Sequence, residues 1–541
     1  MITRNNKRES EAVTIVTLSE LVPQDHLLRK IDNSIDFNFI YDLVEDMYSA
    51  EKGRPSIDPV VLFKIVFIQY LFGIRSMRQT IEEIKVNLAY RWFLGLGFYD
   101  EVPHHSTFGK NYSRRFQNTT LFKDIFSNIL SQAYDKNFIK EENVFVDSTH
   151  IKAYANKNKK KEVTITESLS KYEQQLNNEI NEVRISDNKK EFDFEETKEV
   201  TRKESKTDPE SGYYVKGEHE KCFAYSAQTV CDKNGFVLGS VVVPGNVHDS
   251  QSFHLLYEET IKNNENIKRV VADSAYKTPI IAKTIHSDNK ELVSPYTRPK
   301  TNSEYFKKGE FEYHKDGDFF TCPAGIILTY RTTNRNGYRE YRADKKSCKD
   351  CPFKNQCTKS SNKTLTRHIH QKHIDLVESK RLLEPYKEIY KQRKETIERV
   401  FGDTKFKQSL GITTLRGLVK NQVRVLLLFV CHNMKKMATW ETKAKYPIKK
   451  RSKKEDSSFT FFEFFKNVIN NLIFSLKKRV MRNYSLLKNC FVYSLIEKPF
   501  GFSIFFYKQL NYCLYFYNKF FHFYLLTLHH HLYYPKRINL H

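Results

Sequence analysis

The first part of the chain carries its apolar residues in helical patterns rather than in strict alternation. Residues 59–72 are apolar on nearly every side, follow the cap-forming Asp58 and end before Gly73. A second helix is expected over 76–86, with basic side chains on its surface. These signals predict a helical domain over residues 1–135.

Beyond residue 135 the pattern changes to short runs of β-branched and aromatic residues. Two of these runs are joined by a turn that contains Asn234-Gly235, a strong signal for a β-hairpin. The predicted strands are 143–149, 224–230, 236–243, 269–274 and 291–294. Together with the helical patterns between and after them, they predict an α/β domain over residues 136–440.

Two polar stretches interrupt this domain and are interpreted as insertions. The first, at about 156–215, is charge-dense and contains a helical patch. The second, at about 300–376, is rich in turns, cysteines and basic residues. A long helix is predicted from about 374 to 407, with an interruption near Pro385.

The end of the chain has a different composition. An apolar helix predicted over 423–437 could cover the sheet. Residues 441–541 comprise a lysine-rich linker and an aromatic-rich tail that has no acidic residue after Glu497. The pattern indicates no role for this tail.

The charge balance narrows the choice of partner. Lysine and arginine number 89 against 64 acidic residues, which gives a formal net charge of +25 and favours nucleic acid before a membrane. No run of about 18 uncharged apolar residues appears, so no membrane partner is expected. The nine cysteines are an odd number, and residues 1–16 lack the apolar core of a signal peptide. We therefore expect a reducing, cytoplasmic compartment, with the protein on the nucleoid when it binds DNA.

A basic segment follows the first predicted helices. The cap-forming Ser106 and Thr107 lead into Arg114 and Arg115. A capped helix with long basic side chains suits DNA, because its N-terminus faces phosphate and its donors reach the grooves. Arg114 and Arg115 are therefore candidate DNA contacts. A solvated basic helix face is the alternative explanation.

Three carboxylates stand out by their positions. Asp147 and Asp273 each end an apolar β run, and Glu398 lies on the long predicted helix. Such residues can converge around hard cations, and phosphodiester cleavage by two metals needs acidic side chains to hold both ions. Each residue taken alone has an ordinary explanation, as a turn former or cap for the aspartates and as a solvated helix residue for the glutamate.

The residues around these carboxylates resemble the motifs of DDE-type insertion-sequence transposases. Residues 146–149, 272–276 and 397–402 are similar to the first Asp, second Asp and Glu blocks of that family. The resemblance is closest to the branch whose glutamate helix carries a tyrosine–arginine–glutamate–lysine signature. Residues 245–249, with His248, resemble that branch's glycine/His-Asp segment, and the likeness extends over about 20–440.

The resemblance implies a ribonuclease-H-like catalytic core with an N-terminal DNA-end-binding region. Asp147, Asp273 and Glu398 would then bind Mg²⁺ or Mn²⁺. The implied activity is metal-dependent cleavage at element ends followed by strand transfer into target DNA. The implied partners are the terminal inverted repeats and target DNA, and a homodimer is expected because two DNA ends must be brought together.

The signature also suggests DNA-binding residues. Lys405 matches the lysine and lies seven residues after Glu398, so two helical turns place both on one face. Tyr390 and Arg393 lie close to the positions that the tyrosine and the arginine of the signature would occupy relative to Glu398. Arg393 stands one residue further from Glu398 than the usual pattern, and Lys394 occupies the expected position. His248 completes the set of candidate DNA contacts.

Four cysteines in the second insertion suggest a structural zinc site. Cys348 and Cys351 form a C-x₂-C pair, with Cys357 after it and Cys322 upstream, and four thiolates suit tetrahedral Zn²⁺. Unrelated thiols are the alternative explanation. Further candidate ligands, which suit DNA contact equally, are His368, His370 and His373.

Two other functions are considered. An inactive or regulatory DNA-binding protein derived from a transposase would need the basic helices but not the three acids. Another ribonuclease-H-like nuclease would share the acids but not the N-terminal DNA-binding region or the signature on the glutamate helix.

Overall fold

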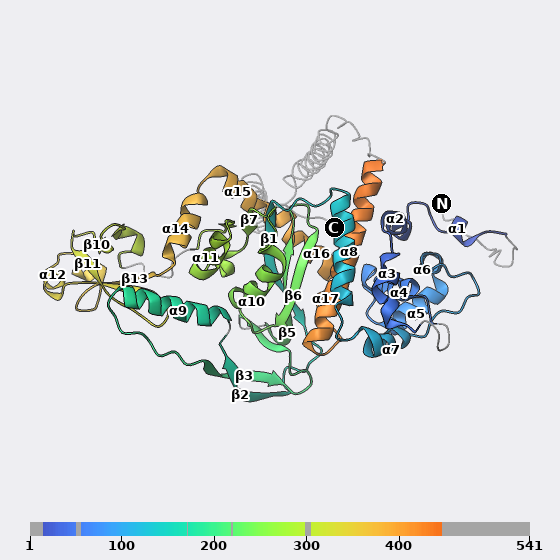
Figure 1. Ribbon diagram of the computed structural model, residues 1–541, viewed down its shortest axis with the longest axis horizontal. Helices are drawn as coiled ribbons and strands as arrows, with labels where there is room; N and C mark the ends of the chain where they lie inside the picture. The colour runs from blue at the N-terminus through green and yellow to red at the C-terminus, as the bar shows by residue number, and fades with distance from the viewer. Residues whose placement is uncertain (1–14, 50–55, 170, 218–219, 298–304, 446–541) are drawn as a thin grey trace, which may run out of the picture. The chain divides into compact units, whose positions relative to one another are not determined.

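The N-terminal part of the chain is helical in the computed structural model, which describes residues 15–445 except 50–55, 170, 218–219 and 298–304 (Figure 1). Its helices are α1 (Leu18–Leu21), α2 (Leu27–Ser34), α3 (Phe39–Val44), a 3₁₀ turn (Glu45–Met47), α4 (Pro59–Leu71), α5 (Met77–Val86), α6 (Leu88–Leu94), α7 (Thr107–Asn111), a π-helix (Tyr112–Phe116) and α8 (Leu121–Asp135). The helices predicted at 59–72 and 76–86 are confirmed as α4 and α5. The aromatic-rich tail predicted after the linker lies outside the described residues.

Capping and burial explain the two predicted helices. The Asp58 carboxylate accepts hydrogen bonds from the amides of Val60 and Val61, and Ser76 caps α5 in the same way. α4 is apolar on all sides because it packs against α3, α5, α6 and α17. The basic segment after residue 105 differs from the predicted DNA-reading helix, since α7 spans five residues and gives way to the one-turn π-helix.

A mixed sheet forms the centre of the region that follows. Its central strands are β1 (Asn143–Lys152), β5 (Glu220–Cys231), β6 (Val237–Pro244), β7 (Arg269–Val271) and β8 (Glu291–Val293), and three strands of the first insertion extend the sheet beyond β5. The central strands run in the order β6-β5-β1-β7-β8, with β5 antiparallel to β1 and β6, and with β7 parallel to β1 and β8. The five predicted strands and the hairpin are confirmed, and the chain is a mixed α/β protein.

Helices pack against this sheet and against one another. They are α10 (Asp249–Leu256), a π-helix (Tyr257–Ile261), a 3₁₀ turn (Ser274–Tyr276), α11 (Pro279–Ser287), α16 (Ile397–Lys407) and α17 (Leu418–Lys445). α17 extends the predicted helix at 423–437 and contacts β6 as well as α2, α4 and α8 (Figure 1). It therefore joins the N-terminal helices to the sheet in one compact unit.

Two polar side chains of α17 bind the backbone of the edge strand β6. Asn433 exchanges two 2.9 Å hydrogen bonds with the amide and carbonyl of Val237. Gln422 accepts from the amide of Val242 at 2.7 Å and donates to the carbonyl of Ser240 at 2.9 Å. Eleven residues are about three helical turns, so both side chains share one face of α17. The helix thus satisfies backbone groups that a sheet edge leaves unpaired.

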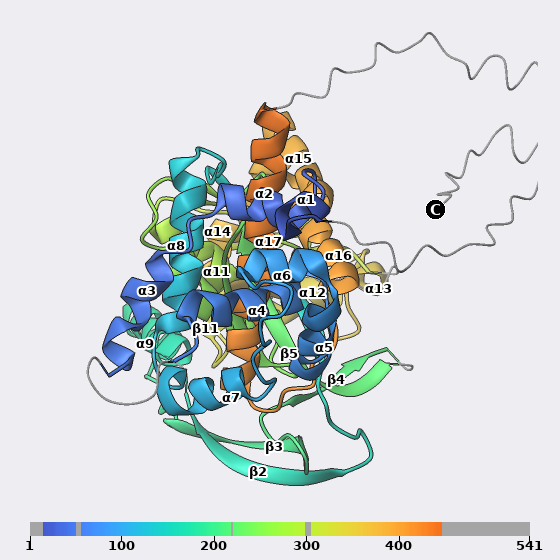
Figure 2. The ribbon, with the colours of Figure 1, turned by 90° about the vertical axis from the view of Figure 1, so that its right-hand side faces the viewer.

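The first predicted insertion contains a long ribbon that the sequence pattern did not reveal. Its elements are β2 (Lys160–Ser168), α9 (Lys171–Ser186), β3 (Thr197–Ser205) and β4 (Gly212–Lys216). α9 confirms the helical patch. β2 and β3 pair along their whole length, and Figure 2 shows them as one curved ribbon. Alternate residues of both strands are half-buried, but this face carries charged side chains as well as Val163, Ile165 and Val200, so the apolar alternation is too weak to mark the strands.

The second insertion is more ordered than its composition suggested. It holds a five-stranded antiparallel sheet in the order β13-β12-β11-β10-β9. Its elements are a 3₁₀ turn (Lys308–Glu310), β9 (Glu312–His314), β10 (Phe319–Thr321), β11 (Ile327–Thr333), β12 (Tyr338–Ala343), α12 (Lys345–Lys349), α13 (Lys354–Cys357) and β13 (Thr364–His368). A small separate core around Phe320, Leu328 and Tyr341 supports it.

The helix predicted from about 374 to 407 is interrupted near Pro385, as predicted, and is broken a second time, which was not predicted. The segment consists of α14 (Gln371–Lys380), α15 (Glu384–Lys391), a 3₁₀ turn (Gln392–Glu395) and α16. One break precedes Pro385, as expected, because proline fits the first turn of α15. A second break occurs at Thr396, whose φ of −109° and ψ of −102° lie outside the helical region. None of the described helices is long and apolar enough to span a membrane.

Gly73 marks a close contact between the N-terminal helices and α16. Its φ is +66°, and a Cβ added there would lie 2.6 Å from the carbonyl oxygen of Lys407. The Ser409 hydroxyl donates to the Gly73 carbonyl at 2.9 Å. Only glycine combines this left-handed conformation with so close a backbone approach.

We predict that Gly73→Ala lowers the free energy of unfolding by about 1–3 kcal/mol, because it adds backbone strain and a clash. The matched control is Gly402→Ala, since Gly402 lies inside α16 and an added Cβ would meet no atom within 4 Å. The control should be neutral or slightly stabilising. Chemical denaturation of both variants measures the difference, and equal stabilities would contradict the role of Gly73.

Candidate active site

Two aspartates lie at matching positions along the neighbouring parallel strands β1 and β7. β1 pairs with β7 at Phe145 and Val271, and each aspartate stands two residues further along, Asp147 on β1 and Asp273 just beyond β7. Neighbouring strands lie about 4.8 Å apart, and residues two apart point to the same face. The pairing of β1 with β7 therefore brings Asp147 and Asp273 side by side.

Asp147 is balanced between burial and one cation. Burial raises the pKa of Asp147 to about 6, and the nearby carboxylates of Asp273 and Asp249 act in the same direction. Arg393 opposes them, since its Nη2 lies 2.7 Å from Oδ2 of Asp147 and only 6% of its side chain is exposed. The amide of Ser148 also donates to Asp147 Oδ1, at 2.8 Å. One buried guanidinium thus offsets the charge of this carboxylate.

Asp249 is a third acidic group of this cluster, and the sequence analysis did not single it out. Gln228 donates to its Oδ1 at 2.8 Å and accepts from the Tyr276 hydroxyl at 2.6 Å. Burial raises the pKa of the Tyr276 hydroxyl, and the carboxylates of Asp249, Asp147 and Asp273 raise it further. These hydrogen bonds link Tyr276 through Gln228 to Asp249, and Tyr276 is close enough to Asp147 and Asp273 to be affected by their charges.

His248 helps to position Asp249. Its Nδ1 accepts a hydrogen bond from the amide of Ser250 at 3.2 Å, so it caps α10, of which Asp249 is the first residue. A negative charge at that position is favoured by the helix dipole. The only signal for Asp249 in the sequence was its place in the segment 245–249.

Glu398 does not join the aspartates directly. It lies in the first turn of α16, which packs against β1, and its side chain is exposed. Within the described part of the chain, Glu398 has no hydrogen bond or ion pair with Asp147 or Asp273, and no three His, Cys, Asp or Glu side chains are grouped to hold a metal ion. Mutual repulsion among carboxylates is a physical reason for this separation. The structure brings together two of the three predicted ligands.

Lys405 lies within electrostatic range of the acidic cluster. Burial lowers the pKa of Lys405, as does Lys216, whereas Asp147 and Glu220 act in the opposite direction. It also lines a cleft of about 720 Å³ together with Arg75. A cation in this position could bind a phosphate group beside Asp147.

The break before α16 decides which basic residue faces Asp147. Arg393 lies in the 3₁₀ turn and is buried against Asp147, whereas Lys394 is exposed. A 3₁₀ turn has about 3.0 residues per turn instead of 3.6, so an α-helical register does not apply across it. Tyr390 lies beside Arg393, whose Nη1 donates to its hydroxyl at 3.4 Å.

Arg114 and Arg115 lie elsewhere in the described chain. Both are exposed on the π-helix, and the Arg115 guanidinium donates to Asn111 and stacks 4.5 Å from the ring centroid of Tyr48. The structure records no contact between either arginine and the acidic cluster. Their role in DNA binding stays a prediction.

The four cysteines of the second insertion are near one another. Burial raises the pKa of Cys357, and Cys322, Cys348 and Cys351 contribute to the rise. Cys322 accepts a hydrogen bond from the amide of Ile326 at 3.3 Å. Of the other candidate ligands, His370 faces Glu179, with 2.7 Å between the nitrogen and the oxygen, and His373 faces His286 at 3.1 Å. These histidines therefore have partners other than the cysteines.

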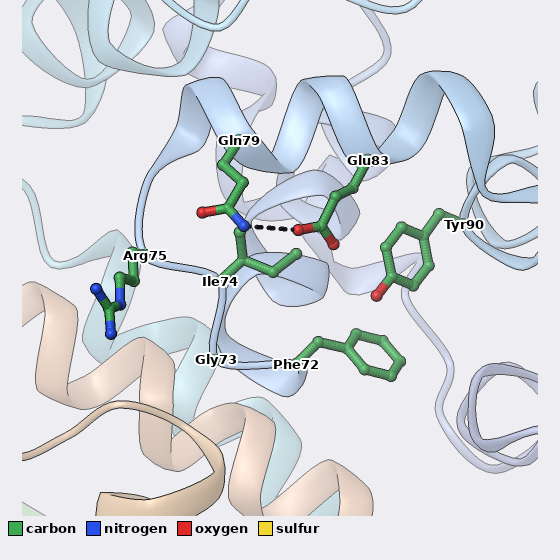
Figure 3. A pocket seen from close by; sticks show the side chains of 7 residues that line it. All are labelled: Phe72, Gly73, Ile74, Arg75, Gln79, Glu83 and Tyr90. Carbon is green, nitrogen blue, oxygen red and sulfur yellow. Dashed lines mark hydrogen bonds between the residues drawn. The ribbon is translucent and has the colours of Figure 1, made fainter.

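A recess of about 540 Å³ between α4, α5 and α6 offers different chemistry (Figure 3). Gln79 donates to Glu83 at 2.9 Å along α5, on one wall of the recess, and Arg75 points away from both. It holds a single carboxylate, so it lacks the paired acids of the sheet edge.

Comparison with known families identifies two segments. Residues 16–114 match a transposase domain family (DUF772), and residues 321–438 match a transposase DDE domain family. The second match contains Glu398, Lys405 and the four cysteines, whereas Asp147 and Asp273 lie outside both matches. No curated protein matches the chain by sequence.

Comparison with solved structures gives loose alignments. A cryo-EM structure of the piggyBac transposase synaptic complex with hairpin DNA aligns at 8% identity and a TM-score of 0.28, covering 78% of this chain and 74% of that one. The Mos1 transposase paired-end complex with left transposon end aligns at 11% identity and a TM-score of 0.13, covering 45% of this chain. The chain spans 61% of the length of that Mos1 transposase. Alignments at these scores carry no inference about the present chain.

The pair of Arg393 and Asp147 gives a pH-dependent prediction. Arg393→Gln should lower the free energy of unfolding by about 3 kcal/mol at pH 8, because it leaves a buried carboxylate unpaired. The loss should shrink at pH 5, since the pKa of Asp147 is already about 6 and rises further without Arg393, so that protonation removes the unpaired charge.

Thermal or chemical denaturation at both pH values measures this dependence. The matched control is the double variant Asp147→Asn with Arg393→Gln, in which no buried carboxylate is left without its cationic partner. It should be less destabilised at pH 8 than Arg393→Gln alone. An equal loss at pH 5 and pH 8 would show that Arg393 acts through packing only.

Proposed function

Because its two family matches identify the chain as a DDE-type insertion-sequence transposase, we propose that it cleaves DNA at the ends of its element and transfers those ends into target DNA. The single observation that carries the proposal is the pair of register-matched aspartates, Asp147 and Asp273, opposite Arg393. We further propose that the mixed sheet around β1 is a ribonuclease-H-like core. The bound partners would be element ends and target DNA, with a homodimer in the DNA complex.

The acidic cluster has a donor set suited to Mg²⁺ or Mn²⁺. Carboxylate oxygens are the ligands that these hard cations prefer. Asp147 and Asp273 would hold the ions, and Glu398 would join them from the first turn of α16, which already packs against β1. When bound, such ions activate the attacking oxygen and stabilise the leaving oxygen of a phosphodiester.

The protein's own residues would position the DNA around these acids. Lys405 supplies a cation within range of Asp147, where a scissile phosphate must lie. Arg393 keeps Asp147 oriented and partly neutralised before any metal binds. Tyr390, which hydrogen-bonds to Arg393, holds that guanidinium in place. Contacts of His248, Arg114 and Arg115 with DNA are also part of the proposal.

A structural zinc ion in the second insertion is a separate part of this proposal. Cys322, Cys348, Cys351 and Cys357 supply four soft ligands, which Zn²⁺ favours. Their effect on the pKa of Cys357 indicates that they lie near one another, and the ion would have to draw the four thiolates closer, since the described residues hold no ready group of three ligands. The amide hydrogen bond to the Cys322 sulfur would stabilise a thiolate. The small core of this sheet gives such an ion a stabilising role.

The sharpest test of the function is Asp147→Asn, which removes one charge with almost no change of shape. The fold and DNA binding should persist, and cleavage and strand transfer should both collapse, because both steps use the same site. The assay compares the two proteins on supercoiled DNA that carries the element's own ends, with Mg²⁺ or Mn²⁺. Equal cleavage by variant and wild type would remove Asp147 from the site. A wild type that binds these ends but never cleaves them would favour the regulatory alternative.

Cys351→Ser tests the zinc proposal with a readout other than activity. Elemental analysis of purified wild-type protein should find about one zinc per chain, and the variant should lose it. The region from about 320 to 360 should then become sensitive to proteolysis, because the ion stabilises its fold. The matched control is Cys222→Ser, since Cys222 lies on β5, outside this group. Wild-type protein that folds normally with far less zinc would end the proposal.

A further inference from the structure

A second charged recess lies beside α16, distinct from the acidic cluster. It has a volume of about 530 Å³. Its walls are the turn between β5 and β6, the 3₁₀ turn at Gln392–Glu395, α16 and α17. Six of its side chains are cationic: Lys233, Arg399, Lys407, Lys435, Lys436 and Lys443. We refer to it as the basic groove.

The acidic residues of the groove cannot neutralise these cations. Only Glu395 and Asp403 contribute carboxylates. Asp403 is already paired, with its Oδ1 2.5 Å from Nζ of Lys407, and although burial acts in the opposite direction this contact lowers the pKa of Asp403. An excess of positive charge therefore faces the groove.

Two of the lysines are half-buried without a carboxylate partner within ion-pair distance in the described structure. Burial lowers the pKa of Lys435, and the charge of Lys407 adds to this effect. Burial likewise lowers the pKa of Lys436, with a smaller contribution from Arg399, whereas Asp232 acts in the opposite direction. Cations that are partly desolvated beside other cations gain free energy when an anion binds.

Trp440, the large aromatic residue that lines the groove, is occupied by protein contacts. The Lys436 ammonium lies 5.3 Å from its ring centroid, and Phe138 and Phe236 pack edge-on against it at 5.8 and 5.6 Å. It is therefore not free to stack on a nucleobase. The groove offers charge and no stacking surface, which suits phosphate groups rather than bases.

α16 separates the groove from the acidic cluster. Arg399, Asp403 and Lys407 follow one another at intervals of four residues and share one face of the helix. At about 100° per residue, Glu398 and Lys405 fall on another face, roughly opposite Lys407. A ligand in the groove therefore contacts α16 without occupying the site of cleavage.

We propose that the basic groove binds the phosphodiester backbone of duplex DNA away from the phosphate that is cleaved. The inference rests on the proposed function, because a strand-transfer reaction must hold more DNA than the few nucleotides at its active site. Binding through phosphates alone would be independent of sequence. The groove would then add affinity for any DNA that extends past the acidic cluster.

The test is a triple variant, Arg399→Gln, Lys435→Gln and Lys443→Gln. Lys436 is kept because its ammonium packs over the rings of Phe236 and Trp440. Binding of a duplex of about 30 base pairs and arbitrary sequence is measured in EDTA at several salt concentrations. The plot of log affinity against log salt should become less steep, by about two to three units of slope, as expected when two or three phosphate contacts are lost. The matched control is Lys123→Gln, Lys198→Gln and Lys262→Gln, three lysines outside the groove that each pair with a glutamate. It removes the same charge and should change the slope by less than about one.

The outcomes separate the groove from the catalytic proposal. Equal slopes for the triple variant and the control would overturn the groove, because the effect would then be one of net charge only. A correctly folded triple variant with the wild-type slope would overturn it as well. The experiment needs no metal, so a lowered slope in a protein that never cleaves DNA would support the groove while the proposed activity fails.

Discussion

The parallel pairing of β1 with β7 is the constraint on which the candidate site depends. The register pairs Phe145 with Val271, and it therefore also fixes the residues two places further along, which lie on the same face of the sheet. Both of these residues are aspartates. A shift of one residue would turn one carboxylate to the other face of the sheet. Because both strands are buried, their apolar residues hold the register, and the core thereby determines the spacing of the acids.

Placing carboxylates together in a partly buried site carries an electrostatic cost from mutual repulsion and desolvation, which neighbouring side chains offset. Arg393 offsets Asp147, while Gln228 and Tyr276 stabilise Asp249 without adding charge. Burial raises the pKa of Asp147 to about 6, so its protonation competes with ionisation near that pH and responds to a nearby cation.

α16 and α17 connect this site to the rest of the molecule. α17 completes the exposed edge of β6 through Asn433 and Gln422 and packs against the N-terminal helices on its other sides. α16 lies between the acidic cluster and the basic groove, and Gly73 sets its distance from the N-terminal region. One short helix thus lies between the acidic cluster, where metal ions would bind, and the basic groove, where the DNA backbone would bind.

Local patterns in the sequence were sufficient for the helices at 59–72 and 76–86 and for the central strands, because burial imposes a period. Asp147 and Asp273 were chosen for their places after apolar runs, and their catalytic role stays a prediction. The ribbon of β2 and β3 escaped detection because its half-buried face carries at least as many charged residues as apolar ones. The tertiary structure alone decided that the segment from 374 to 407 breaks at Thr396, that Arg393 rather than Lys394 meets Asp147, and that Asp249 joins the cluster. Arg393 and Asp147 are 246 positions apart, and no periodicity in the chain encodes their contact.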